Sequence, residues 1–175
     1  MQRAPGADRL FRVPYGHQEL EFMLQPWFDI DIVESATAEP VADVMAAARA
    51  ALAGPRGSAR LADLARDAVQ AAGSRPAQAV IAVTDLTRAS PDQALVPPLL
   101  EELNAGGIPD AQITVMVGVG LHRATTDAEK REKLGEVVDR VRVIDSDGRD
   151  PAKWADLGSI PPYGVPGSTQ RIVKD

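Results

Sequence analysis

The chain has 175 residues, a net charge of −6 and 45% hydrophobic residues, with no cysteine and only two histidines. Its length suits one medium domain with a proper core, and its acidic balance argues against general affinity for nucleic acid or an anionic membrane. The cysteine and histidine counts exclude disulfides, thiolate nucleophiles, cysteine-ligated zinc and a self-contained histidine-rich metal centre. The amino terminus lacks the apolar stretch of a secretory signal, and no segment approaches about 20 apolar residues, so we expect a cytoplasmic protein.

Residues 10–35 are predicted to form a small β-unit. Residues 19–24 alternate between apolar and polar side chains, as expected for a strand with one covered face. Pro14 to His17 supplies a turn that joins this strand to residues 11–13. Residues 29–33 are expected to add a short partner strand.

Two helices are expected between residues 40 and 76. Val41, Val44, Met45, Ala48 and Leu52 recur at helical spacing, and Gly54-Pro55 ends the run. Ser58 is the predicted N-cap of the second helix.

Residues 40–160 have the order of a βαβ core. Apolar runs at residues 79–84, 113–119 and 141–144 predict three strands, the first of them covered on both faces. Between them, Ser90 is the predicted N-cap of a helix that Pro97-Pro98 interrupts, and the capping box of residues 126–129 opens a helix to about Val138. This alternation predicts a three-layer, Rossmann-like α/β domain with a mainly parallel sheet and right-handed crossovers.

The last eight residues, 168–175, look like the start of another strand. We expect either an edge strand that closes the domain or the front part of a longer protein. Composition alone favours neither of these two interpretations.

Two polar clusters follow directly after predicted strands. Asp85, Thr87 and Arg88 come after the first strand, and His122 and Arg123 after the second. Because ligands bind beyond the carboxyl ends of parallel strands, we expect the clusters to meet at one sheet edge, beside two helix amino termini that favour anions.

The residue types in these clusters suit an acid/base site that handles an anion. An arginine offers a bidentate partner for a carboxylate. Histidine side chains in general titrate near pH 6.5, and an aspartate can orient a histidine or hold an arginine. The alternative is structural: Asp85 and Thr87 shape the turn, Arg88 pairs with a surface acid, and His122 is a hydrogen-bonded loop residue.

Two motif look-alikes are set aside. Gly118-Val-Gly120 follows a strand, but Arg123 stands where a dinucleotide-binding fingerprint needs its third glycine. Asp145, Asp147 and Asp150 resemble a calcium loop, but its glycine is misplaced and its closing glutamate is missing. We interpret that segment as a solvated turn, and His17 as a structural or exposed turn residue.

The motifs D-x-T-R (residues 85–88) and G-x-H-R-x-[ST]-T (residues 120–126) together resemble the amino-terminal domain of nickel-pincer-dependent lactate racemases and their relatives. Gly57-Ser58-x-x-Leu61-x-x-Leu64-Ala65 and Lys133-Leu134-Gly135 support the resemblance, which covers roughly residues 10–160. The order and spacing of the two motifs make the match specific, whereas either motif alone is weak.

The resemblance implies racemisation or epimerisation of a 2-hydroxy acid, by hydride transfer to and from a nickel-pincer nucleotide. It makes His122 one of two acid/base histidines, Asp85 the neighbouring active-site acid and Arg88 the partner of the substrate carboxylate. Thr87 and Arg123, in the same motifs, are further candidates for substrate binding.

In that family the second histidine, the lysine that tethers the cofactor and the nickel-binding histidine lie in a later stretch. Nothing after Gly158 matches it. We therefore expect residues 1–175 to be a single α/β domain at the front of a longer two-domain enzyme. Alone it would bind no cofactor and be inactive, and its partners would be a small 2-hydroxy acid and the carboxy-terminal remainder of the protein.

Two other hypotheses stay open on the residues alone. The chain is then either a non-catalytic α/β module that binds small carboxylates, or an interaction domain in which the motifs are structural.

Overall fold

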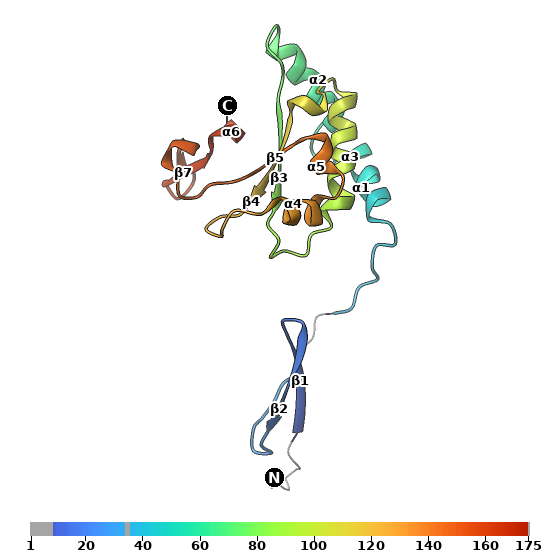
Figure 1. Cartoon of the computed structure of the whole chain (residues 1–175), viewed down its shortest axis with the longest axis vertical. Helices are drawn as coiled ribbons and strands as arrows, with labels where there is room; N and C mark the ends of the chain where they lie inside the picture. Colours follow the sequence, from blue (N-terminus) through green and yellow to red (C-terminus); the bar gives the residue numbers. More distant parts are fainter. Residues whose placement is uncertain (1–8, 34–35, 175) are drawn as a thin grey trace. The chain divides into compact units, whose positions relative to one another are not determined.

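The structure is a computed structural model that describes residues 9–33 and 36–174. Figure 1 shows the whole chain, which divides into two compact units, Met1–Pro40 and Val41–Asp175. The division falls where the predicted β-unit gives way to the predicted helices.

The first unit contains an antiparallel hairpin of β1 (Arg9–Tyr15) and β2 (Gln18–Leu24). Gly16, with φ of 63°, and His17 form the turn between the strands, and the rings of Phe11 and Phe22 stack with centroids 5.7 Å apart. The predicted hairpin is confirmed. The strand expected at residues 29–33 is wrong, because the structure assigns no strand to that segment. Strand propensity depends strongly on its packing context, so an apolar pattern alone does not make a strand.

The second unit is built on a parallel sheet of β3 (Ala79–Thr84), β4 (Ile113–Gly118) and β5 (Arg142–Asp145), in that order. The predicted α/β class and mainly parallel sheet are confirmed. One expectation is wrong: Ala82 and Thr84 are exposed, so β3 is covered on one face and open on the other.

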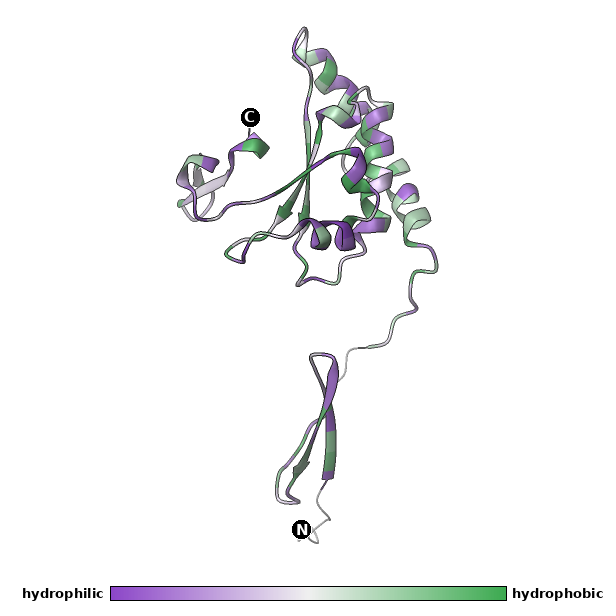
Figure 2. Cartoon of the chain, in the orientation of Figure 1, coloured by the Kyte–Doolittle hydropathy of each residue, from purple (hydrophilic) through white to green (hydrophobic). Residues whose placement is uncertain are grey.

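Helices α2 (Leu61–Ala72), α3 (Asp92–Ala105), α4 (Asp127–Leu134) and α5 (Val137–Arg140) lie on one side of this sheet, and α1 (Val44–Ala53) packs against α3 (Figure 1). The single-turn 3-10 helices η1 (Asp110–Gln112) and η2 (Pro151–Lys153) precede β4 and β6. The core between helices and sheet includes Ile81, Val115, Leu100 and Leu134. In Figure 2 strands β3 and β4 are mostly hydrophobic, whereas α4 is mostly hydrophilic. Within the described ranges, no helix has both the length and the apolar character needed to cross a membrane.

Two predicted N-caps are wrong. Helix α2 begins after Arg60, and the Ser58 hydroxyl donates to the Ala59 carbonyl instead. Helix α3 begins after Pro91 without a side-chain cap, because the Ser90 hydroxyl donates to the Asp92 carboxylate at 2.7 Å. In both places a local side-chain bond competes with the cap.

Pro97 and Pro98 do not interrupt α3, contrary to the prediction. They remove two helical hydrogen bonds, which costs about 3 kcal/mol or more per residue in an isolated helix. Pro98 is fully buried beside Val96 and Leu100 in the core. Tertiary packing therefore holds the helix continuous through both residues.

The predicted capping box at the start of α4 is confirmed. The Glu129 carboxylate accepts from the Thr126 backbone N–H at 2.8 Å, and the Thr126 hydroxyl accepts from the Glu129 N–H at 3.3 Å. The helix predicted to reach Val138 ends at Leu134, because Gly135 adopts a φ of 60° and α5 starts separately at Val137.

The carboxyl end forms a second antiparallel pair, β6 (Trp154–Ile160) and β7 (Val165–Gln170), followed by α6 (Arg171–Lys174). The strand predicted from residue 168 therefore begins at Val165 and gives way to a helical turn at Arg171. Asp175 lies outside the described residues.

Gly106, the C-cap of α3, lies tightly against α2. A Cβ at this position would lie 2.3 Å from the Ala65 Cβ and 2.5 Å from the Ala62 carbonyl oxygen. We predict that Gly106→Ala lowers the free energy of unfolding by about 1–3 kcal/mol, measured by urea denaturation, because the helices must move apart. Gly54→Ala is the control, since its nearest neighbour would be 3.8 Å away. Equal stability of the two variants would contradict this packing.

The ion pair of Arg123 with Glu129 predicts a pH-dependent stability. Bonds from Arg123 and from the Thr126 backbone lower the pKa of Glu129 to about 2. The charged carboxylate therefore stabilises the fold fully above its ordinary pKa of 4.5, and this contribution is lost as the pH falls through about 2.

We predict that Glu129→Gln is less stable than the wild type at pH 7, and that the difference shrinks between pH 4.5 and 2. Denaturation at a series of pH values measures it. Glu132→Gln, on the same helix, serves as the control. A stability difference for Glu129→Gln that stays constant down to pH 2 would contradict the prediction.

Candidate functional site

The loops after β3 and β4 lie at the same edge of the sheet. Thr84 and Gly118 are register partners at the ends of the two parallel strands. Asp85, the residue after β3, therefore lies next to the turn of residues 119–122 that follows β4. This shared edge brings together polar residues that are 37 positions apart in the sequence.

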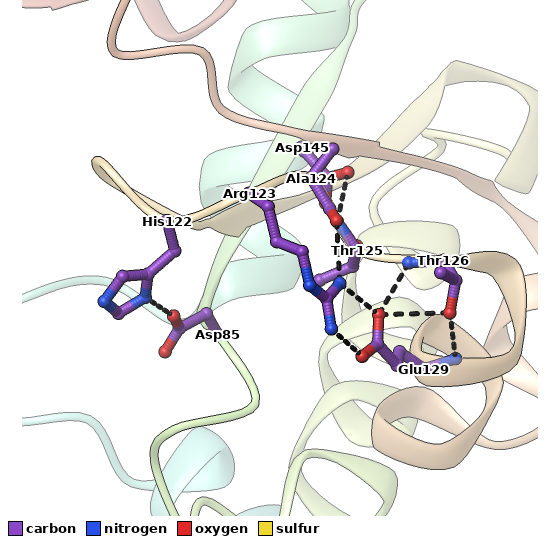
Figure 3. Close-up of polar contacts among 8 residues, drawn as sticks. All are labelled: Asp85, His122, Arg123, Ala124, Thr125, Thr126, Glu129 and Asp145. Carbon is purple, nitrogen blue, oxygen red and sulfur yellow. Dashed lines mark hydrogen bonds and ion pairs between the residues drawn. The ribbon is translucent and has the colours of Figure 1, made fainter.

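The Asp85 carboxylate is the centre of the site. One oxygen, Oδ1, accepts from the Thr87 hydroxyl at 2.7 Å and from the Thr87 backbone N–H at 3.2 Å. The other, Oδ2, contacts Nδ1 of His122 (Figure 3). The Thr87 hydroxyl, then His122, lower the pKa of Asp85 to about 2, although burial of the residue opposes this shift. Asp85 is therefore a carboxylate near neutral pH, with both oxygens engaged.

Among the described residues, His122 has hydrogen-bond partners for its backbone N–H and for one ring nitrogen only. Its N–H donates to the Val119 carbonyl at 2.9 Å, in a turn where Gly120 adopts a φ of 58° that favours glycine. Its side chain is 61% exposed, and the ring nitrogen that does not contact Asp85 points away from the carboxylate in Figure 3. This nitrogen, Nε2, is open to a ligand.

Besides a cavity of about 240 Å³ between the loops after β4 and β5, two neighbouring cavities open at this edge. The first, of about 330 Å³, is lined by Asp85, Thr87, His122 and Arg123. The second, of about 320 Å³, is lined by Arg88 and Lys133, and Leu86 lines both cavities. The structure thus joins Asp85 to His122, whereas Arg88 faces the adjoining cavity.

The two arginines of the motifs differ in their bonding. The exposed Arg88 side chain has no hydrogen-bond or ion-pair partner among residues 9–33 and 36–174, although its backbone N–H donates to the Asp85 carbonyl. Arg123 makes a two-pronged pair with Glu129, at 2.8 and 2.5 Å. Arg88 is therefore available to an anion, and Arg123 stabilises the start of α4. Thr87 is likewise engaged, as the donor that orients Asp85.

A second carboxylate that the sequence reasoning did not assign to the site stabilises the loop of His122. Asp145, at the end of β5, accepts from the Thr125 hydroxyl at 2.5 Å and from the Thr125 N–H at 3.1 Å (Figure 3). Lys130 lies 3.5 Å from the same carboxylate. The sequence does place Asp145 after the third predicted strand, which is where ligand-binding residues are expected. From the sequence alone we nevertheless interpret that segment only as a solvated turn.

Gly148 brings the loop after β5 against the loop of His122. A Cβ on Gly148 would lie 2.7 Å from the Gly120 carbonyl oxygen, so only glycine allows this approach. The Arg149 guanidinium also donates to the Leu121 carbonyl at 3.1 Å. The loops after all three parallel strands therefore support one another.

The described part of the chain contains no group of three or more histidine, cysteine, aspartate or glutamate residues arranged to hold a metal ion. The side chains at this edge are suited to orienting an imidazole and binding an anion.

Comparisons with known proteins agree on one family. The family model of the lactate racemase N-terminal domain matches residues 15–175. A lactate racemase of Thermoanaerobacterium thermosaccharolyticum is 28% identical over 155 residues, which cover 87% of this chain and 34% of that protein. The lactate racemase of Lactiplantibacillus plantarum is 32% identical over 111 residues, which cover 63% of this chain and 24% of that protein.

The fold agrees as well. The structure of the lactate racemase apoprotein from T. thermosaccharolyticum matches with a TM-score of 0.70 and 25% identity, over 94% of this chain and 36% of that chain. This chain thus spans about a third or less of the length of these relatives. A family model that matches nearly the whole sequence, together with this fold, shows that the chain belongs to the lactate racemase N-terminal domain family.

Proposed function

We propose that this chain forms one half of the active site of a 2-hydroxy-acid racemase or epimerase with a lactate-like substrate. The observation that carries the proposal is the contact between Asp85 and Nδ1 of His122, which leaves Nε2 open at the sheet edge. Membership of the lactate racemase N-terminal domain family supports the same reaction class.

His122 is the acid/base residue in this proposal. With Nδ1 directed at the Asp85 carboxylate, the neutral ring carries its proton there, and Nε2 is the basic atom. Nε2 takes the proton of the substrate hydroxyl and returns it when the hydroxyl forms again. Asp85 acts through His122, because it holds the orientation and the tautomer of the ring.

Arg88 is the residue that binds the substrate carboxylate. Its guanidinium has no partner in the described chain and is matched in shape to a carboxylate. Leu86 lines the cavities of both Arg88 and His122, so a small 2-hydroxy acid that reaches both would lie across it. Thr87 and Arg123 support this arrangement through Asp85 and Glu129.

The hydride chemistry belongs to a part of the enzyme outside this chain. Within the residues described, no cluster could hold nickel, so these residues do not fit the metal centre of a nickel-pincer nucleotide. We propose that the longer protein supplies the cofactor, its anchor and a second histidine. This chain, tested alone, is then inactive.

One prediction of the proposed function concerns carboxylate binding. We expect lactate to bind this chain weakly, with a Kd on the order of 1 mM or above, as measured by NMR titration. Arg88→Ala abolishes binding because it removes the bidentate partner. Arg56→Ala, another exposed arginine, is the control. Unchanged lactate binding in Arg88→Ala would contradict the assignment of Arg88 to the substrate carboxylate. Lactate binding without racemase activity in the full-length protein would favour a carboxylate-binding module.

Another prediction of the proposed function concerns the full-length protein. We expect His122→Ala to lower the rate of racemisation by at least about a hundredfold, because general acid/base groups contribute on that scale. Cofactor content, measured by metal analysis, stays at the wild-type level. His17→Ala, the other histidine of the chain, keeps full activity. Retained racemisation in His122→Ala would overturn the proposed role.

A further inference from the structure

A buried ion pair lies at the base of the loop that carries Asp85 and Arg88. Lys133, in the last turn of α4, places Nζ 2.7 Å from Oδ2 of Asp92, the first residue of α3. Their side chains are only 4% and 6% exposed. Oδ2 has no hydrogen-bond partner among the residues described, so the ammonium is what compensates its charge.

Lys133 connects the two ends of this loop. Its Nζ also donates to the Thr84 hydroxyl at 3.4 Å, at the end of β3 where the loop begins. Asp92, where the loop ends, accepts from the Ser90 hydroxyl at 2.7 Å, and its N–H donates to the Ser90 carbonyl at 2.9 Å. Residues 85–91 are thus closed at their base by one ammonium group.

The neighbouring contact of α3 with α4 keeps Lys133 in place. The Gln93 side-chain amide donates to the Glu132 carbonyl at 2.6 Å. Gly135 lies next to the same side chain, since a Cβ there would be 3.3 Å from it. The loop therefore rests on a helix junction that is itself hydrogen-bonded.

We propose that Lys133 and Asp92 are positioning residues, which hold the loop of residues 85–91 in the conformation that presents Asp85 to His122 and Arg88 to the adjoining cavity. Stability alone does not account for such a pair, because replacing a buried ion pair with apolar residues often leaves the stability of a protein unchanged or raises it. A pair that spans both ends of a functional loop has a role in geometry. The inference rests on the proposed function only in treating this loop as part of the active site.

The test compares backbone order and ligand binding in this chain. The Thr87 and Arg88 amides both donate to Asp85, so their hydrogen exchange reports the loop conformation. The first variant, Asp92→Asn with Lys133→Met, removes both charges and leaves no lone buried ion. The second, Thr84→Val, removes only the tie to the start of the loop. Lys130→Met on the same helix is the control, because Lys130 pairs with Asp145 instead.

In the double variant we expect exchange at Thr87 and Arg88 to accelerate at least about tenfold, while exchange in β4 stays at the wild-type rate. Thr84→Val gives a smaller acceleration at the same two amides, and Lys130→Met gives none. Lactate binding weakens in parallel. Loop exchange at the wild-type rate in the double variant, or in Thr84→Val if the double variant does not fold, overturns the inference.

The outcomes also separate this inference from the proposed function. If the wild type fails to bind lactate while loop exchange responds as expected, the positioning role stands and the assignment of Arg88 fails. If lactate binds through Arg88 but neither loop hydrogen exchange nor lactate affinity changes when the buried pair is removed, the proposed function stands and the positioning role fails.

Discussion

The parallel pairing of β3 with β4 is the constraint on which the site depends. Because Thr84 and Gly118 are register partners, the residues that follow them leave the sheet together. A shift of the register by one residue would turn alternate side chains to the opposite face. The contact of Asp85 with His122 is therefore a consequence of strand register, and the turn at Gly120 completes it.

The polar residues around this contact fall into two groups. Some are paired with one another and fix the loops, whereas others are free to bind a ligand. Thr87 and Glu129 each satisfy a charged partner, Asp85 and Arg123 respectively, and Asp145 secures the loop of His122 through Thr125. Within the part of the chain that the structure describes, Nε2 of His122 and the Arg88 guanidinium have no hydrogen-bond or ion-pair partner. These are the groups that proton transfer and carboxylate binding require, and their availability gives the family relationship a physical meaning in this chain.

The sequence predicted the parallel strands and the capping box of Thr126 because apolar runs and local motifs determine them. It could not predict that Pro97 and Pro98 stay within α3, since burial in the core decides this. The approach of Asp85 to His122 was predictable from strand order. The separate cavity of Arg88 was not, because it depends on how residues 85–91 turn. The sequence marked Lys133 only as part of a supporting motif, because its burial beside Asp92 depends on how α4 packs against α3.

The proposed role of His122 depends on its orientation by Asp85, which the tautomer of the neutral imidazole reports. Nitrogen-15 NMR of this chain distinguishes a proton on Nδ1 from one on Nε2. We expect the Nδ1–H form to dominate in the wild type and to lose its dominance in Asp85→Asn, whose amide can donate to Nδ1. A wild-type ring that carries its proton mainly on Nε2, or a tautomer unaffected by Asp85→Asn, would contradict the orientation of His122 by Asp85.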